Sequence, residues 1–309
     1  MHSIVPMVPI SVVIPTYNRP NILVSTVQSY LAGDVLPTEI VIVDQSETAI
    51  DHKSIGDARG VNVRIVNSDV PSSTRSRNIG VRESTNDIVL FSDDDVLVAS
   101  NTIEQLWLDM QETDIALIAS INKTENSLYG EATSTGVARS VGGILMGMKK
   151  PWRKGGYVVR SNMRGRFASH MTVPQPTEWA MGFFFCVRKS LMERWDCWFD
   201  ESLKRYAYAE DLDFSMRYCS RASSEDMRTI VDPRLWVQHL ASTEWRTPSD
   251  EATHYYVQNR RYISKKIYPC RWWYRLSMSW FDTLWALANI RDTAYCVCLL
   301  KEVWLGRGL

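Results

Sequence analysis

Short runs of apolar and β-branched residues recur through the first third of the chain, and they restrict its fold more than any other feature. These runs lie at Ile10–Pro15, Glu39–Asp44, Val61–Val66 and Ile88–Phe91. Consecutive apolar residues are typical of strands buried on both faces, while residues 21–32 and 76–84 have helical patterns. Strands and helices at this spacing predict right-handed crossovers and an α/β fold with a mostly parallel sheet flanked by helices.

Acidic side chains stand where two of these strands end. Asp44 ends the second strand, and the fourth stops at the triplet Asp93–Asp95. Ligands of parallel sheets gather at the carboxyl ends of the strands, where Pro15–Tyr17 also lies. Three adjacent carboxylates repel one another unless a cation or a polar partner is present, and their hard oxygen atoms suit Mg²⁺ or Mn²⁺. A solvated acidic turn or a helix N-cap is the alternative interpretation of the triplet.

The middle of the chain continues the same alternation and then loses it. Helices are expected at residues 101–111 and 189–195, and strands at 115–121 and, after Gly182, up to Arg188. Residues 123–178 have no regular pattern. We expect this long irregular segment to be functional and to influence acceptor choice.

A second acidic group and a histidine follow. Glu210, Asp211 and Asp213 open an amphipathic helix. Acids at a helix start complement its dipole by about 0.3–1 kcal/mol each, which accounts for one or two of them, so three favour a functional member. Residues 230–231 and 235–239 predict a hairpin-like pair ending at His239, for which a structural hydrogen bond is the alternative to metal binding.

Composition narrows the class of protein. The 309 residues include 35 basic and 35 acidic side chains, so the bulk charge gives no reason to expect a nucleic-acid partner. The six cysteines lack zinc-type spacing and are expected to be buried free thiols in a reducing cytosol. The N-terminus has no signal-peptide pattern, and no window reaches about 18 uninterrupted apolar residues. A cytoplasmic location is therefore expected.

Taken in order, these motifs resemble the inverting GT-A glycosyltransferases of family 2, over roughly residues 9–240. The matching segments are Val12–Arg19 for the first strand and nucleotide-binding turn, Arg77-Asn78 within Ser73–Gly80 for the Arg-Asn-x-Gly signature, Asp93–Asp95 for the D-x-D metal motif, and Gly182–Arg188, Phe199–Glu201 and Glu210–Asp213 for the acceptor-side half. Gln45-Ser46 departs from the family pattern, in which another acid follows Asp44. The resemblance implies the GT-A (Rossmann-like) fold.

The resemblance also implies a role for each candidate residue. Asp211 is the expected catalytic base, and Asp95 and His239 are the expected ligands of Mn²⁺ or Mg²⁺. Among the triplet, Asp94 is expected to be the most dispensable. The expected donor-binding residues are Pro15, Thr16, Tyr17, Arg19, Asp44, Arg77, Asn78, Asp93 and Asp94. The expected acceptor-binding residues are Trp179, Gly182, Glu210 and Asp213.

The implied reaction moves a sugar from a nucleotide-diphosphate donor to a hydroxyl of a glycan or polyprenyl-diphosphate-linked saccharide, in bacterial surface polysaccharide or glycoconjugate synthesis. Asp44 is compatible with uracil or thymine, so a UDP or dTDP donor is expected. One alternative is a nucleotidyltransferase, but no Gly-rich loop follows the first strand. The other is a non-catalytic sugar-binding module, which loss of Asp95 or Asp211 would have favoured.

The last part of the chain is rich in tryptophan. The expected division is a GT-A domain at 1–250, with a donor half at about 9–122 and an acceptor half at about 123–250, and an amphipathic helical region at 251–309. Five of the twelve tryptophans occur in the final 38 residues, and basic residues outnumber acidic ones nine to three from Tyr255 onward. Such helices suit an anionic membrane surface, here the inner face of the cell membrane. Packing on the GT-A domain or on a second subunit in a homodimer is the alternative.

Overall fold

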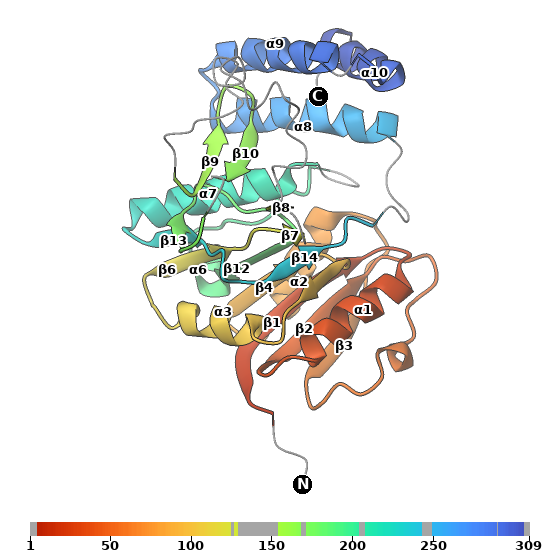
Figure 1. Cartoon of the computed structure of the whole chain (residues 1–309), viewed down its shortest axis with the longest axis vertical. Helices are drawn as coiled ribbons and strands as arrows, with labels where there is room; N and C mark the ends of the chain where they lie inside the picture. Colours follow the sequence, from red (N-terminus) through yellow and green to blue (C-terminus); the bar gives the residue numbers. More distant parts are fainter. Residues whose placement is uncertain are drawn as a thin grey trace.

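A mixed sheet forms the centre of the computed structural model (Figure 1), which describes residues 5–124, 127–128, 154–167, 171–203, 208–242, 249–288 and 290–305. The strands are β1 (Met7–Thr16), β2 (Leu36–Asp44), β3 (Asn62–Asn67), β4 (Ile88–Ser92), β5 (Val96–Val98), β6 (Ile115–Ala119), β7 (Lys123–Thr124), β8 (Ser127–Leu128), β9 (Gly156–Val159), β10 (Arg164–Phe167), β11 (Gln175–Pro176), β12 (Phe184–Arg188), β13 (Arg228–Val231) and β14 (Val237–His239). Among these residues the main sheet has eight strands, in the order β11-β13-β6-β12-β4-β1-β2-β3.

Most neighbouring strands of this sheet run parallel, as the sequence predicts. Strand β1 pairs in parallel with β2 and β4, β2 with β3, and β6 with β13. Strand β12 runs antiparallel between β4 and β6. The carboxyl ends of β1, β2 and β4 therefore lie at one edge, where ligands of such sheets bind.

Helices cover both faces of the sheet. The helices on the sheet are α1 (Pro20–Leu31), α2 (Ser73–Glu83), α3 (Thr102–Met110), α6 (Lys189–Arg194) and α7 (Glu210–Ser224). The described residues also form the short 3₁₀ helix η1 (His52–Ile55) and the C-terminal helices α8 (Ser249–Ile267), α9 (Trp272–Ala288) and α10 (Thr293–Trp304). Side chains alternate between the faces along each strand. In β4, Leu90 packs in the core formed with α1 and α3, and Phe91 packs in the core formed with α2, α6 and α7. The strand is buried on both faces, as its sequence predicts.

Helix α2 packs unusually close to β1. It begins earlier than its predicted start at residue 76 because the hydroxyl of Ser72 accepts a hydrogen bond from the amide of Arg75. A Cβ atom added to Gly80 would lie 2.2 Å from the side chain of Val13. The absent side chain at Gly80 thus lets the helix approach the central strand and fixes the height of Arg77 above the sheet.

Two predictions about irregular regions are wrong. Strands β13 and β14 do not form a hairpin, because β13 joins the main sheet beside β6 and β14 pairs antiparallel with β5. Part of segment 123–178 is regular, since β9 and β10 form an antiparallel pair. Residues 125–126, 129–153 and 168–170, which include most of the basic run 149–154, lie outside the described residues. Of the cysteines expected to be buried, Cys270 is exposed.

The last three helices stack beyond the sheet, with α8 between α7 and the pair α9–α10 (Figure 1). Ile263 of α8 packs with three side chains: Leu212 of α7, Met278 of α9, and Trp179, which precedes β12. A buried ion pair of 2.5 Å between Arg260 and Asp282 joins α8 to α9. Among the described helices, none combines the length and the apolar character needed to cross a membrane.

Candidate active site

A cleft of about 1120 Å³ opens at the carboxyl ends of β1 and β4. Its lining comes from the β1 turn, α2, the acidic triplet, the segment before β12, the start of α7, His239 and the first turn of α8. Most residues that the sequence predicts for the site line this cleft. Asp44, Asn78 and Asp213 do not.

Asp93, Asp95 and His239 converge on one point of the cleft. Their ligand atoms lie within 4.8 Å of one another. The Nε2 atom of His239 lies 2.9 Å from Oδ1 of Asp95 and 3.8 Å from Oδ2 of Asp93. The imidazole stacks on the ring of Phe183, with ring centres 5.3 Å apart. The pairing of β14 with β5 places His239 opposite Val96, next to the triplet.

This trio fits a divalent cation. Two carboxylates and an imidazole suit Mn²⁺, and the carboxylate oxygens also suit Mg²⁺. Burial alone would raise the pKa of Asp95, but the hydrogen bond and charge of His239 and the amide of Ser242 hold that pKa below its ordinary value. Asp95 is therefore favoured in the ionised form that a metal ligand needs.

Asp94 points into the protein. Its carboxylate accepts hydrogen bonds from Thr16 at 2.8 Å and Arg19 at 3.1 Å, and its carbonyl accepts one from Thr26 at 2.6 Å. Burial raises its pKa to about 6, against the opposing charge of Arg19. These contacts fix the β1 turn against the triplet, which argues against the expectation that Asp94 is the most dispensable of the three.

Asp211 lies at the start of α7 with its carboxylate held by backbone amides. The amide of Gly182 donates to Oδ2 at 2.9 Å, and the amide of Leu212 donates to Oδ1 at 2.7 Å. Burial raises the pKa of Asp211 above its ordinary value, although these amides oppose the shift. Ala209, just before the helix, has a left-handed backbone with φ of 71°. An oriented carboxylate with a raised pKa suits proton abstraction.

Arg77 connects the two sides of the cleft. Its buried guanidinium donates to Asp93 at 2.9 Å, to Glu210 at 2.7 Å and to the carbonyl of Gly182 at 3.2 Å. Burial raises the pKa of Glu210 to about 7, with the charge of Arg77 opposing it. One cation from α2 thus fixes the triplet relative to the start of α7.

Two predicted donor-binding residues instead shape neighbouring loops. Both oxygens of Asp44 accept hydrogen bonds from backbone amides, of Ser46 and Ile50, each at 2.9 Å. Asn78 bonds with both the amide and the carbonyl of Phe199, at 3.0 Å each. These side chains are turned away from the cleft, so their support of the donor site is indirect.

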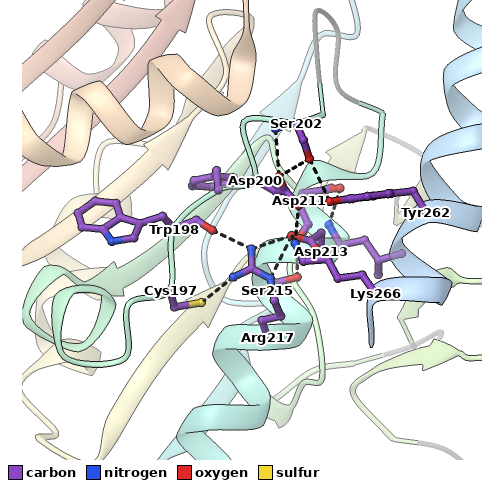
Figure 2. Close-up of polar contacts among 12 residues, drawn as sticks. Cys197, Trp198, Asp200, Ser202, Asp211, Asp213, Ser215, Arg217, Tyr262 and Lys266 are labelled. Carbon is purple, nitrogen blue, oxygen red and sulfur yellow. Dashed lines mark hydrogen bonds and ion pairs between the residues drawn. The ribbon is translucent and has the colours of Figure 1, made fainter. Parts of the chain in front are cut away.

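Asp213, predicted to bind acceptor, lies in the first turn of α7 and is completely buried. Its Oδ2 accepts hydrogen bonds from Arg217 at 2.6 Å and from Lys266 of α8 at 3.0 Å (Figure 2). Glu210 lines the cleft, whereas Asp213 does not. Asp211 and Asp213 are two positions apart in the helix, so their side chains point in different directions, and their presence in one motif does not reveal which of them faces the cleft.

Several lining residues were missed. The polar and charged ones include Arg75, Glu201, Tyr208, Ser242 and Glu251. Arg75 and Glu201 lie inside motifs that the sequence analysis recognised, so the motif itself was the available signal. Glu251 belongs to the first turn of α8, and no local pattern marks a residue of the C-terminal helices as part of the cleft.

Comparisons with known proteins agree with this architecture. YwdF, an uncharacterized glycosyltransferase of Bacillus subtilis (strain 168), is 30% identical over 107 residues, which span 34% of this chain and 39% of that relative. TarS of S. aureus is similar in structure, with 19% identity and a TM-score of 0.53 over 93% of this chain and 44% of TarS. The chain thus covers less than half the length of either protein.

Two further solved structures were determined with nucleotides. The mannosyltransferase PcManGT of Pyrobaculum calidifontis, in complex with GDP-Man and Mn²⁺, has 14% identity and a TM-score of 0.54 over 96% of this chain and 88% of its own. GalNAc-T7 with UDP, GalNAc and Mn²⁺ has 15% identity and a TM-score of 0.54 over 94% of this chain and 57% of its own. At such identities the likeness establishes the GT-A fold alone.

The sequence itself establishes the family. The profile described as Glycosyl transferase family 2 matches residues 11–173, more than half of the chain. That stretch carries the β1 turn, Arg77 and the acidic triplet, and the other predicted site residues that line the cleft come from the segment before β12, from α7 and from β14. The protein belongs to glycosyl transferase family 2 and has the GT-A fold.

Proposed function

We propose that this protein is an inverting, divalent-metal-dependent glycosyltransferase that moves a sugar from a nucleotide-diphosphate donor to a hydroxyl of a glycan or lipid-linked saccharide. The observation that carries the proposal is that Asp211 and the trio of Asp93, Asp95 and His239 face one cleft and are linked through Arg77. A base and a site for the leaving diphosphate are the two requirements of such a transfer.

Asp211 acts as the base in this proposal. Its Oδ2 is oriented by the amide of Gly182, and its raised pKa strengthens it as a proton acceptor. The acceptor hydroxyl gives its proton to Asp211 as its oxygen bonds to the sugar carbon, and the bond to the diphosphate breaks on the opposite side. Displacement from the opposite side inverts the configuration at that carbon.

The trio provides for the departing diphosphate. Asp95 and His239 would hold the ion, with Asp93 close enough to contact it or its water. When bound, Mn²⁺ or Mg²⁺ neutralises the negative charge that develops on the leaving group. Arg19, which is paired with Asp94, and Arg75 also line the cleft and add positive charge there.

The donor is proposed to carry UDP or dTDP, placed against the β1 turn. A panel of sugar nucleotides, screened for hydrolysis with and without Mn²⁺, tests the reaction and identifies the donor. Metal-dependent hydrolysis of one donor supports the enzyme. Tight donor binding without hydrolysis or transfer would favour a sugar-binding module, and pyrophosphate-dependent conversion to a nucleoside triphosphate would favour a nucleotidyltransferase.

The exposed side of α9 supports docking on an anionic membrane. Trp273, Leu276, Trp280 and Leu287 recur at helical spacing and are 43%, 59%, 63% and 53% exposed. Trp273 and Trp280 are therefore not buried, although α8 and α9 pack on the GT-A domain through Ile263 and Met278. The single acid of α9, Asp282, is buried in its pair with Arg260, while Arg271 directly precedes the helix and Arg275 lies in it. Indole rings beside basic residues suit the headgroup layer of anionic lipids.

This docking would place the enzyme on the inner face of a bacterial membrane, beside polyprenyl-diphosphate-linked acceptors used for surface polysaccharides. Flotation with phosphatidylglycerol vesicles tests it. The wild type should float, and a Trp273→Ser/Trp280→Ser variant should not. A wild type that does not float but dimerises through α9, with the variant monomeric, would assign the stripe to a second copy instead.

A further inference from the structure

One side of helix α8 contacts the segments that carry the acceptor side of the cleft. Asn259, Tyr262 and Lys266 are spaced by three and four residues, so they share one side of the helix. The Nδ2 atom of Asn259 donates a hydrogen bond to the carbonyl of Tyr208 at 3.0 Å. Tyr208 lines the cleft and precedes the start of α7. Helix α8 thus touches the approach to the helix that carries Asp211.

Lys266 joins two carboxylates from different segments. Its Nζ atom lies 2.6 Å from Oδ2 of Asp200 and 3.0 Å from Oδ2 of Asp213, as Figure 2 shows. Burial alone would raise the pKa of Asp200, but hydrogen bonds from Lys266 and Ser202 hold it far below its ordinary value. Asp213 is completely buried, and a buried carboxylate requires cationic or hydrogen-bonding partners.

Each of these carboxylates belongs to a segment that reaches the cleft. Asp213 lies in the first turn of α7, two residues after Asp211. Asp200 precedes Glu201, which lines the cleft. The hydroxyl of Tyr262, also on α8, donates a further hydrogen bond to Asp200, at 2.9 Å. The ammonium of Lys266 therefore holds the segment of Glu201 against the helix of Asp211.

The start of α7 has few supports of its own. Its N-cap residue, Ala209, has no side chain that can accept a hydrogen bond from the first turn, and its left-handed backbone is costly for a residue other than glycine. Contacts from outside the helix must therefore fix this turn, and Lys266 supplies one of them.

We propose that Lys266 is a positioning residue for Asp211. It holds the first turn of α7 and the Asp200 segment together, so the C-terminal helices form part of the catalytic structure. The proposal rests on the assignment of Asp211 as the base. Without the ammonium, Asp200 and Asp213 repel each other and the first turn of α7 shifts. A misplacement of about 1 Å can lower a rate on the order of 100-fold.

Hydrogen–deuterium exchange of the full chain tests the physical link without any substrate. Lys266→Met should speed exchange in peptides covering residues 208–216 and leave the sheet unchanged, and Lys266→Arg should restore slow exchange. Lys265→Met is the matched control, because it makes the same substitution at the adjacent position of α8. Unchanged exchange at 208–216 in Lys266→Met overturns the proposal, whether or not the protein transfers sugar.

Kinetics with the donor found by the panel complete the test. Lys266→Met should lower kcat about 100-fold. The KM for donor should stay within about twofold, because the ion pairs of Lys266 are with Asp200 and Asp213 and not with the β1 turn or the triplet. Equal loss in kcat and donor affinity would indicate general damage and overturn the positioning role. An inactive wild type whose exchange still depends on Lys266 would refute the proposed reaction alone.

A milder change covers the case in which Lys266→Met fails to fold. Tyr262→Phe removes only the hydroxyl that bonds to Asp200 and keeps the ring in place. It should speed exchange at residues 199–203 and 208–216 by a smaller factor. Wild-type exchange in both regions would count against the role of this side of α8.

Discussion

The guanidinium of Arg77 lies 2.7 Å from the carboxylate of Glu210, and this buried ion pair joins the donor and acceptor sides of the cleft. The same guanidinium contacts Asp93 of the triplet. The position of the base relative to the metal trio therefore depends on one cation from α2. A family signature residue thus has a structural task beyond any contact with the donor.

Removal of this cation should be costly. Arg77→Met leaves the carboxylates of Asp93 and Glu210 without their cation, and loss of one partner of a buried pair lowers the free energy of unfolding by about 3–5 kcal/mol. Adding Glu210→Met should recover part of this loss, which urea denaturation measures. Strictly additive effects of the two substitutions would show that the pair does not couple. Arg75→Met, on the same helix but more exposed, is the control.

Glu210 should make stability depend on pH. Its pKa rises from 4.5 to about 7 on folding because the carboxyl is buried. The folded state thus binds the proton more tightly, so this contribution is present below about pH 4.5 and is lost as the pH rises through about 7. Between pH 5 and 8, wild type should lose more stability than Glu210→Gln. Parallel pH profiles of the two proteins would contradict the shift.

The metal trio predicts selective loss of Mn²⁺ binding. Asp95→Ala and His239→Ala should each weaken Mn²⁺ affinity by more than about 100-fold, since even changes behind metal ligands cost 10–100-fold. Electron paramagnetic resonance of free Mn²⁺ measures this in the presence of the donor. The exposed Glu193→Gln should bind like wild type. Unchanged affinity in Asp95→Ala would remove this residue from the site.

The close contact of α2 with β1 is testable by a single methyl group. Gly80→Ala places a carbon 2.2 Å from Val13, and overpacking of this kind costs about 1–3 kcal/mol. Combining it with Val13→Ala makes room and should restore part of the stability relative to Val13→Ala alone. If Gly80→Ala unfolds at the wild-type urea concentration, the helix does not approach the strand this closely.

The sequence predicts the sheet and the cleft because both follow from local patterns. The apolar runs of β1, β2 and β4 identify buried strands, and Asp95 follows the carboxyl end of one of them. Parallel order then places Asp95 near the β1 turn without further information. The assignment of these residues to one region needed only the alternation of strands and helices.

The remaining features depend on contacts between distant segments. His239 reaches Asp95 because β14 pairs with the three-residue β5, a strand too short to recognise from sequence. The side chain of Asp213 faces Lys266 rather than the cleft because α8 packs behind α7. The first turn of α8, with Glu251, enters the cleft for the same reason. In each of these contacts, the sequence around one residue gives no indication of its distant partner.

Asp211→Asn tests the central claim most directly, because the amide keeps the shape of the side chain but cannot accept the proton. With the donor identified by the nucleotide-sugar panel, kcat for transfer should fall by about 10²–10⁴-fold, while Mn²⁺-dependent donor binding remains within about threefold of wild type. The exposed Asp196→Asn should transfer normally. Transfer by Asp211→Asn at the wild-type rate would contradict the account.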